Sequence, residues 1–330
     1  MKNKNTITDV RGIEVGHAQN EEALTGCTVI LCRKGAVAGV DVRGSAPGTR
    51  ETDLLNPVNL VQKVHAIVLA GGSAFGLDAA SGVMRYLEEK KIGFDTGVAK
   101  VPIVPAAILF DLNLGQASIR PDSAMGYQAA ASASSAPPGE GNIGAGTGAS
   151  VGKMFGSKLA MKSGLGTASL DIGGGVVIGA IVAVNAWGDV VDPQTNKILA
   201  GLRSGKVGPL RVGGKDQFAD TLAMLKSPVG RNLLDLTSRS NTVIGVVATN
   251  AKLTKAQATK VAQMAQAGIA RTVKPAHSML DGDVIFALST SSKKADVSTL
   301  GAFAAEVMAA AIVRAVKTAR SAGGLPGLGK

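Results

Sequence analysis

Residues 174–187 form a strand-like run, G-G-V-V-I-G-A-I-V-A-V-N-A-W, in which no polar side chain occurs before Asn185. A strand that faces water on one side alternates polar and apolar residues, so this run is expected to be buried on both faces. A second buried strand, T-V-I-G-V-V-A-T, is expected at 242–249. Forty-three glycines and only 3% aromatic residues fit an interior of small side chains. These features indicate layered α/β packing.

No long polar or charged linker interrupts the apolar pattern, so residues 1–330 are expected to form one domain. Residues 200–241 lose periodicity and gain charge, Gly and Pro, which indicates a surface excursion that could be cut without unfolding the rest. Further strands are expected at 28–31, 36–42, 66–70 and 283–290. A glycine turn that leads into a helix is expected at 71–87. Other helices are expected at 121–135, at 300–321, and from a cap at Thr254 to about Arg271.

The N-terminus lacks the apolar stretch of a signal peptide, and apolar runs elsewhere are broken by Gly or charge. The protein is therefore expected to be cytoplasmic and not membrane-bound. The net charge of +11 is dispersed and almost no aromatic residues accompany it, so nucleic-acid binding is not expected. Cys27 and Cys32 lie an odd number of residues apart on one strand, about 16 Å at roughly 3.3 Å per residue, so buried free thiols are expected.

The glycine-dense loop at 139–153 resembles a phosphate cradle but fails the P-loop pattern. Thr147 stands where that pattern needs the first Gly, and Met154 stands where it needs Ser or Thr. The turn at 71–76 lacks the dinucleotide-binding spacing, although its N–H groups could hold an anion or serve as an oxyanion hole. Three histidines and two cysteines give little material for a zinc site. No cofactor or metal is expected.

Thr242 follows Asn241 where the irregular segment meets a buried strand. By strand propensity alone Thr242 would be structural. In this context, however, its hydroxyl could attack the preceding carbonyl, convert the amide to an ester and let water release Asn241. The α-amino group freed on Thr242, with a pKa of roughly 8, could then act as the base for the hydroxyl of the same residue.

At this point the sequence resembles the DmpA family of self-processing aminopeptidases and amidases, particularly the threonine-nucleophile branch that includes the nylon-oligomer endohydrolase. The resemblance covers nearly the whole chain. Its motifs are D-V-R-G-I-E-V-G-H at 9–17, R-G-S-A-P-G-T-R-E-T-D-L-L at 43–55, L-A-G-G-S-A-F-G-L-D-A-A at 69–80, G-A-G-T-G-A-S-V-G-K at 144–153, V-N-A-W-G-D-V-V-D-P at 184–193, N-T-V-I-G-V-V-A-T-N at 241–250 and D-G-D-V-I-F-A at 281–287.

The resemblance implies a four-layer α/β/β/α sandwich, of the type shared with ornithine acetyltransferases, and assembly into homo-oligomers. It also implies cleavage into fragments 1–241 and 242–330. Thr242 would be the nucleophile and Lys153 would steady negative charge or tune the amine. Asn185 would stabilise the oxyanion, while Asp281 and Asp283 would orient Thr242; His277 is left without a role.

Substrate does not follow from the resemblance. Phe110 stands in the substrate pocket where the nylon hydrolase has a tyrosine, and the aminopeptidase members tend to carry Ser at the nucleophile. The expected activity is hydrolysis of small amides or peptides. Endo-type cleavage of aminohexanoate oligomers, acyl transfer to an amine, and a non-enzymatic, uncleaved binding protein are the alternatives.

Overall fold

The structure, a computed structural model, describes residues 4–228, 230 and 241–330. Its main sheet has the strand order β10-β11-β16-β18-β2-β4-β7-β3, with β1 paired to β2. The pairs β16–β18 and β4–β7 are parallel and the other pairs are antiparallel. The strands are β1 (Glu14–Asn20), β2 (Thr25–Val42), β3 (Thr49–Arg50), β4 (Lys63–Ala70), β7 (Ala106–Ile108), β10 (Leu165–Asp171), β11 (Val177–Asn185), β16 (Thr242–Ala251) and β18 (Val284–Lys293).

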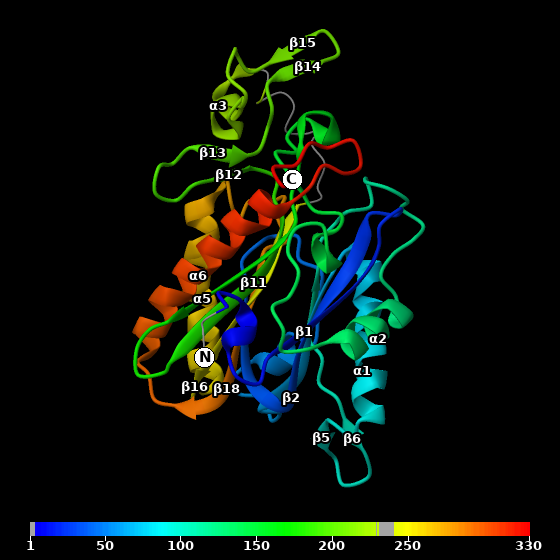
Figure 1. Cartoon of the computed structure of the whole chain (residues 1–330), viewed down its shortest axis with the longest axis vertical. Helices are drawn as coiled ribbons and strands as arrows, with labels where there is room; N and C mark the ends of the chain where they lie inside the picture. Colours follow the sequence, from blue (N-terminus) through cyan, green and yellow to red (C-terminus); the bar gives the residue numbers. More distant parts are fainter. Residues whose placement is uncertain (1–3, 229, 231–240) are drawn as a thin grey trace.

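The expected α/β/β/α layering is confirmed, and its two β-layers are one continuous sheet folded on itself. The sheet folds on itself along the long strand β2. This strand pairs with β18 through residues 37–42 and with β4 through residues 27–37, so it belongs to both halves of the sheet. Helices α5 and α6 cover one half of the sheet, and α1 and α2 cover the other (Figure 1). The helices are α1 (Ala79–Glu89), α2 (Ser123–Ser132), α5 (Lys255–Thr272) and α6 (Val297–Thr318).

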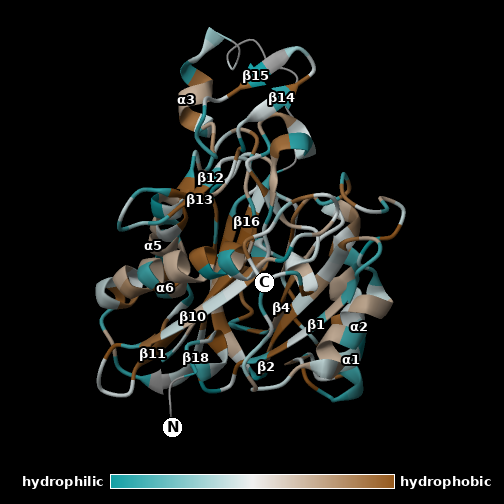
Figure 2. Cartoon of the chain, turned by 45° about the horizontal axis from the view of Figure 1, so that its top comes forward, coloured by the Kyte–Doolittle hydropathy of each residue, from teal (hydrophilic) through white to brown (hydrophobic). Residues whose placement is uncertain are grey.

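Strand β11 is buried on both faces, as its unbroken apolar run predicts. Ala180, Val182 and Val184 pack in the cluster beneath α5 and α6, whereas Ile181 and Ala183 pack in the cluster between the two halves of the sheet. Figure 2 shows the hydrophobic residues concentrated on the strands between the helix layers. Two buried faces on one strand require a layer on each side, which is the physical basis of the four-layer arrangement.

Several local predictions are confirmed and others are refined. The Thr254 side chain accepts a hydrogen bond from the Gln257 N–H and so caps α5. The strands expected at 28–31 and 36–42 are both parts of β2, which is irregular between Leu31 and Ala36. Cys27 and Cys32 are free and buried in different clusters on opposite faces of β2, and burial raises the pKa of each thiol to about 12.

Residues 201–228 form a lobe at one end of the molecule (Figure 1), and this lobe is more ordered than a bare surface excursion. Its apolar residues Leu202 and Val212 pack in a cluster that also contains Met154, Leu159 and Trp187 from outside the lobe. Residue 229 and residues 231–240 of the expected excursion lie outside the described residues. The other short strands and the short α-helix are β5 (Phe94–Asp95), β6 (Lys100–Val101), β8 (Ser150–Val151), β9 (Met161–Lys162), β12 (Asp189–Val191), β13 (Ile198–Ala200), β14 (Gly205–Val207), β15 (Leu210–Val212), α3 (Thr221–Lys226) and β17 (Val273–Lys274). The short 3-10 helices of the described residues are Ile7–Asp9, Asp53–Leu55, Ser73–Asp78, Gly144–Gly146 and Gly156–Leu159.

Helix α6 is long and apolar enough to cross a membrane by length and composition. Its most apolar 18-residue window has a mean hydropathy of 1.6, and 61% of that window is buried. A core helix of a globular domain meets the same description. Here α6 packs on α5, β10 and β11 and contributes to the core.

Candidate active site

Thr242 is the first residue of β16 and is only 4% exposed. Strand pairing places it directly opposite Asn185, the last residue of β11. Its Oγ1 donates a 2.5 Å hydrogen bond to the carbonyl oxygen of Asn241, the residue that precedes it. The hydroxyl is therefore held against the peptide bond that the sequence analysis expects to be cut.

The same carbonyl oxygen accepts a second hydrogen bond, 2.9 Å long, from the backbone N–H of Gly282. A Cβ atom at position 282 would lie 2.5 Å from the Ala46 oxygen and 3.0 Å from Thr242 Oγ1. Glycine is thus the residue that allows this close approach. The D-G-D motif predicts roles for its two aspartates, whereas the role of the glycine between them depends on contacts that form only in the folded chain.

Asn185 and Lys153 form a buried pair beside Thr242. Lys153 Nζ donates to the Asn185 backbone oxygen at 2.9 Å and to its Oδ1 at 2.8 Å. Oδ1 also accepts from the Ser150 N–H, and Nδ2 donates to the Phe110 carbonyl oxygen at 2.8 Å. In the uncleaved chain the Asn185 amide is thus fixed from both ends. Phe110 contributes its backbone carbonyl to this arrangement, a role that is independent of its side chain.

Lys153 reaches this position through a glycine turn. Gly152 has a left-handed φ of +72°, and a Cβ there would lie 2.0 Å from a backbone carbon of Gly201, so only glycine fits. Burial lowers the pKa of Lys153 to about 7, although the negative charges of Asp281 and Asp111 act in the opposite direction. An amine with such a pKa gains or loses its proton near neutral pH.

Asp281 and Asp283 lie beside the segment that contains Asn241 and Thr242, because Asn241 pairs with Asp281 in an isolated parallel bridge. Asp281 Oδ2 accepts from the N–H and Oγ of Ser278 at 2.8 and 2.6 Å. Asp283 Oδ1 accepts from the N–H of Val243, the residue after Thr242, at 2.8 Å. Burial, and then the charge of Asp283, raises the pKa of Asp281 to about 6.

His277, for which the sequence predicts no role, also lies in this cluster. Its Nδ1 lies 2.9 Å from Asp283 Oδ2, and its backbone N–H donates to the same oxygen at 3.2 Å. Both contacts fix the carboxylate orientation. The spacing of six residues across a turn, H-S-M-L-D-G-D, was the available sequence signal.

Two further buried groups support the site and were not identified from the sequence. Asp111 accepts from the Gly72 N–H at 2.7 Å and from Thr25 Oγ1 at 2.8 Å, and burial raises its pKa. Lys162 Nζ donates to the carbonyl oxygens of Gly146, Ala149 and Ser163, and burial lowers its pKa to about 7. Lys162 therefore ties together the glycine loop that carries Lys153.

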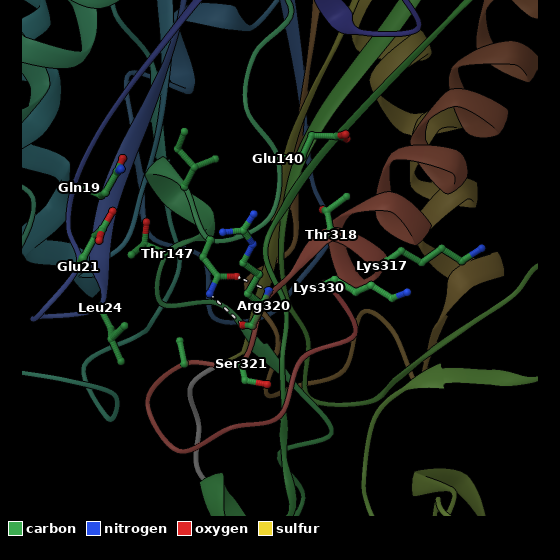
Figure 3. A pocket seen from close by; sticks show the side chains of 14 residues that line it. Gln19, Glu21, Leu24, Glu140, Thr147, Lys317, Thr318, Arg320, Ser321 and Lys330 are labelled. Carbon is green, nitrogen blue, oxygen red and sulfur yellow. Dashed lines mark hydrogen bonds between the residues drawn. The ribbon is translucent and has the colours of Figure 1, made fainter.

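A cavity of about 820 Å³ lies between the end of α6, β1 and the glycine loop (Figure 3). Asn142 and Arg320 exchange two hydrogen bonds at its wall, of 2.9 and 3.0 Å. Among its described lining residues are none of the predicted site residues. This cavity is therefore separate from the candidate active site.

The family model of peptidase family S58 matches residues 5–328. An uncharacterized aminopeptidase of Mycobacterium tuberculosis is 43% identical, over 98% of this chain and 96% of that protein. A 6-aminohexanoate-oligomer endohydrolase of Paenarthrobacter ureafaciens is 32% identical, over 94% of this chain and 85% of that protein.

Two solved structures share the fold. A β-aminopeptidase of Burkholderia sp. has a TM-score of 0.67 and 24% identity, covering 98% of this chain and 91% of that chain. The L-aminopeptidase D-Ala-esterase/amidase of Ochrobactrum anthropi, described as a variant of the Ntn hydrolase fold, has a TM-score of 0.68 and 23% identity, covering 98% and 88%. The family match over almost the full length confirms the resemblance to the DmpA family, and the chain belongs to peptidase family S58 as a peptide or amide hydrolase.

Proposed function

We propose that the protein cuts its own Asn241–Thr242 bond and then hydrolyses small amides or peptides with Thr242 as its N-terminal nucleophile. The observation that carries this proposal is the pair of contacts on one carbonyl oxygen, from Thr242 Oγ1 and from the Gly282 N–H. The first contact holds the nucleophile at the scissile group. The second donates a hydrogen bond where negative charge develops during attack.

Self-cleavage then proceeds in two steps, an acyl shift from nitrogen to oxygen and the hydrolysis of the resulting ester. Thr242 Oγ bonds to the Asn241 carbonyl carbon, the C–N bond breaks, and the hydroxyl proton passes to the departing α-amine. Water next attacks the resulting ester, which gives the Asn241 carboxylate and restores the Thr242 hydroxyl. The products are fragments 1–241 and 242–330.

Substrate hydrolysis repeats this chemistry on an external amide. The freed α-amine of Thr242 takes the proton from its own hydroxyl, which attacks the substrate carbonyl and expels the amine product. Water then releases the acid from the acyl-enzyme. In this proposal Lys153 supplies positive charge beside Asn185, and Asp283 orients the new terminus; the contacts that support these roles are those of Lys153 with Asn185 and of Asp283 with the Val243 N–H.

This mechanism uses neither metal nor cofactor. The names of the relatives cover both an aminopeptidase and an oligomer endohydrolase, so they support amide hydrolysis without choosing between exo- and endo-type cleavage. Homo-oligomeric assembly and a cytoplasmic location are parts of the same proposal that rest on the resemblance and the sequence.

The proposal is tested by assaying purified wild-type protein and Thr242→Ala on a panel of aminoacyl anilides, β-peptides and aminohexanoate oligomers. We expect release of amine from at least one substrate by wild type and from none by the variant. Equal activity of the two proteins would show that another residue is the nucleophile.

A further inference from the structure

The lobe carries a concentration of positive charge that the proposed function does not use. Its β14–β15 hairpin (Figure 1) and the C-terminal segment line a cavity of about 850 Å³. Among the described lining residues are four cations, Arg203, Lys206, Arg211 and Lys215, and one carboxylate, Asp216. The whole chain, in contrast, has 35 basic and 24 acidic residues. The lining of this cavity is therefore much more basic than the chain as a whole.

Two of these cations face each other across the hairpin. Strand pairing places Lys206 of β14 directly opposite Arg211 of β15, so both side chains leave the same face of the hairpin. Like charges in directly opposite positions destabilise a strand pair. Both residues are exposed, and neither forms an ion pair within the described part of the chain. An anion bound between them would replace this repulsion by attraction.

Arg203 presents a third charge, which is fixed in position. Its Nε donates to the Ala160 carbonyl oxygen at 3.3 Å, and its Nη2 donates to the Lys158 carbonyl oxygen at 2.9 Å. These acceptors are neutral, so the two contacts orient the guanidinium group without neutralising its charge. An arginine held in this way loses little conformational freedom when it binds a carboxylate.

The cavity continues beyond the hairpin. A second cavity of about 520 Å³ adjoins it, because Arg203 and Pro326 line both. The second cavity follows the C-terminal segment and is also lined by Ser321 and Leu325. We call the two cavities together the lobe groove. Its elongated shape, with the cations gathered at the hairpin, fits an extended chain better than a compact ion.

The lining of the lobe groove favours a polypeptide over a single-stranded nucleic acid. None of its described lining residues is aromatic, so bases would have no ring on which to stack. Met161 and Leu328 add apolar surface, and Gln217 adds an amide group. These groups suit the aliphatic and amide parts of a peptide, while its Asp and Glu carboxylates would pair with the arginines and lysines.

We propose that the lobe groove binds an acidic polypeptide segment in an extended conformation. Carboxylates of this segment bind Lys206, Arg211 and Lys215 at the hairpin and Arg203 beside it. Thr242 and the other predicted site residues are not among the described lining residues of either cavity. The inference therefore concerns a second site, and it does not depend on the proposed function.

The test measures the binding of fluorescein-labelled octaglutamate to the full-length protein by fluorescence anisotropy. We expect saturable binding to wild type and the same affinity in Thr242→Ala. The double substitution Lys206→Glu/Arg211→Glu reverses the facing charges and should weaken binding at least about tenfold.

The matched control is Lys252→Glu/Lys260→Glu, which changes the net charge by the same amount. Both of these lysines are exposed, and neither lines the described part of the lobe groove. Because screening by salt limits the effect of distant charges, this control should weaken binding no more than about twofold. Equal weakening in the two double variants would show that only net charge matters and would overturn the inference.

The other results that would overturn the inference are as specific. They are an absence of octaglutamate binding to wild type, a loss of binding in Thr242→Ala, and displacement of octaglutamate by a lower concentration of octathymidylate than of unlabelled octaglutamate. If the hairpin variant does not fold, Lys215→Glu replaces it, since this side chain is exposed. We expect Lys215→Glu to weaken binding at least about threefold, and unchanged affinity would contradict the proposed site.

Discussion

The side-chain amine of Lys153 donates to both the backbone and the side-chain oxygen of Asn185, at 2.9 and 2.8 Å. This contact joins the glycine loop to the end of β11, opposite the proposed nucleophile Thr242. Both partners are almost fully buried, Lys153 at 2% and Asn185 at 0% exposure. When protonated, the Lys153 amine therefore places a positive charge at the end of β11 with little screening by water.

Replacing Lys153 by Met should remove this charge while keeping an unbranched side chain that is one atom shorter. We expect self-cleavage to slow at least about 100-fold, as for loss of a preorganised electrostatic group. Lys255→Met is the matched control, since Lys255 is also buried, at 3% exposure, and its described hydrogen bonds go only to the backbone carbonyls of Leu54, Asn59 and Val61. It should lower the free energy of unfolding in urea by about 1–3 kcal/mol, while the folded fraction still cleaves itself. Similar cleavage defects in both variants would contradict a specific role for Lys153.

The rate of self-cleavage should fall as pH decreases through about 6, because Asp281 is then protonated and no longer carries the charge proposed to orient Thr242. Burial raises the pKa of this carboxyl first, and the charge of Asp283 raises it further. Asp283→Asn removes that charge, so the fall of the cleavage rate at acidic pH, the acid limb of the pH–rate profile, should move to lower pH. This shift is expected whatever the effect of the substitution on the maximal rate. The acid limb is measured by following the cleavage of pulse-labelled precursor on denaturing gels between about pH 4.5 and 8, in steps of about 0.5 pH unit. A limb that stays in place in Asp283→Asn would exclude Asp281 as its origin.

Asp189 should make folding stability depend on pH. It accepts hydrogen bonds from the Leu202 N–H and from the N–H and Oγ1 of Thr221, and so attaches the lobe to β12. Burial raises its pKa from 3.8 to about 6, which corresponds to about 3 kcal/mol. The pKa of Asp189 is higher in the folded state than in the unfolded state, so its protonated form stabilises the fold. This contribution to the free energy of unfolding is fully present below the unfolded pKa of 3.8 and is lost as pH rises through about 6.

In Asp189→Asn the fall in unfolding free energy between pH 4 and 6 should consequently be smaller than in wild type, by up to about 3 kcal/mol. Urea unfolding at several pH values measures the difference. Parallel curves for the two proteins would mean that Asp189 does not titrate in this range.

Gly282→Ala should impair self-cleavage, because its Cβ would lie 2.5 Å from the Ala46 oxygen and displace the N–H that binds the Asn241 carbonyl. We expect at least about tenfold slower processing, consistent with a weakened oxyanion donor. Gly214→Ala is the control, since nothing lies within 4 Å of a Cβ at that exposed position. Normal processing of Gly282→Ala would remove the argument for its N–H.

Local pattern was sufficient to predict the buried strands and the capped helix after Thr254, because each depends on residues close in sequence. It was also sufficient to expect Asn185 and Thr242 at strand ends. The folding of the sheet on itself could not be predicted, since it depends on β2 serving two partners at long range. Asp111, Lys162 and Gly282 were missed for a related reason: their importance lies in backbone groups that become neighbours only in the folded chain.

The central claim is that the Thr242 hydroxyl, 2.5 Å from the Asn241 oxygen, breaks the bond between these residues. Intact-mass analysis with N-terminal sequencing tests it most directly. For wild type we predict two fragments, 1–241 and 242–330, the second of which begins with Thr242. Thr242→Ser should give two fragments of the same lengths. Thr242→Ala should give a single chain of 330 residues. Active wild-type enzyme consisting only of the intact chain that begins at Met1 would contradict the account.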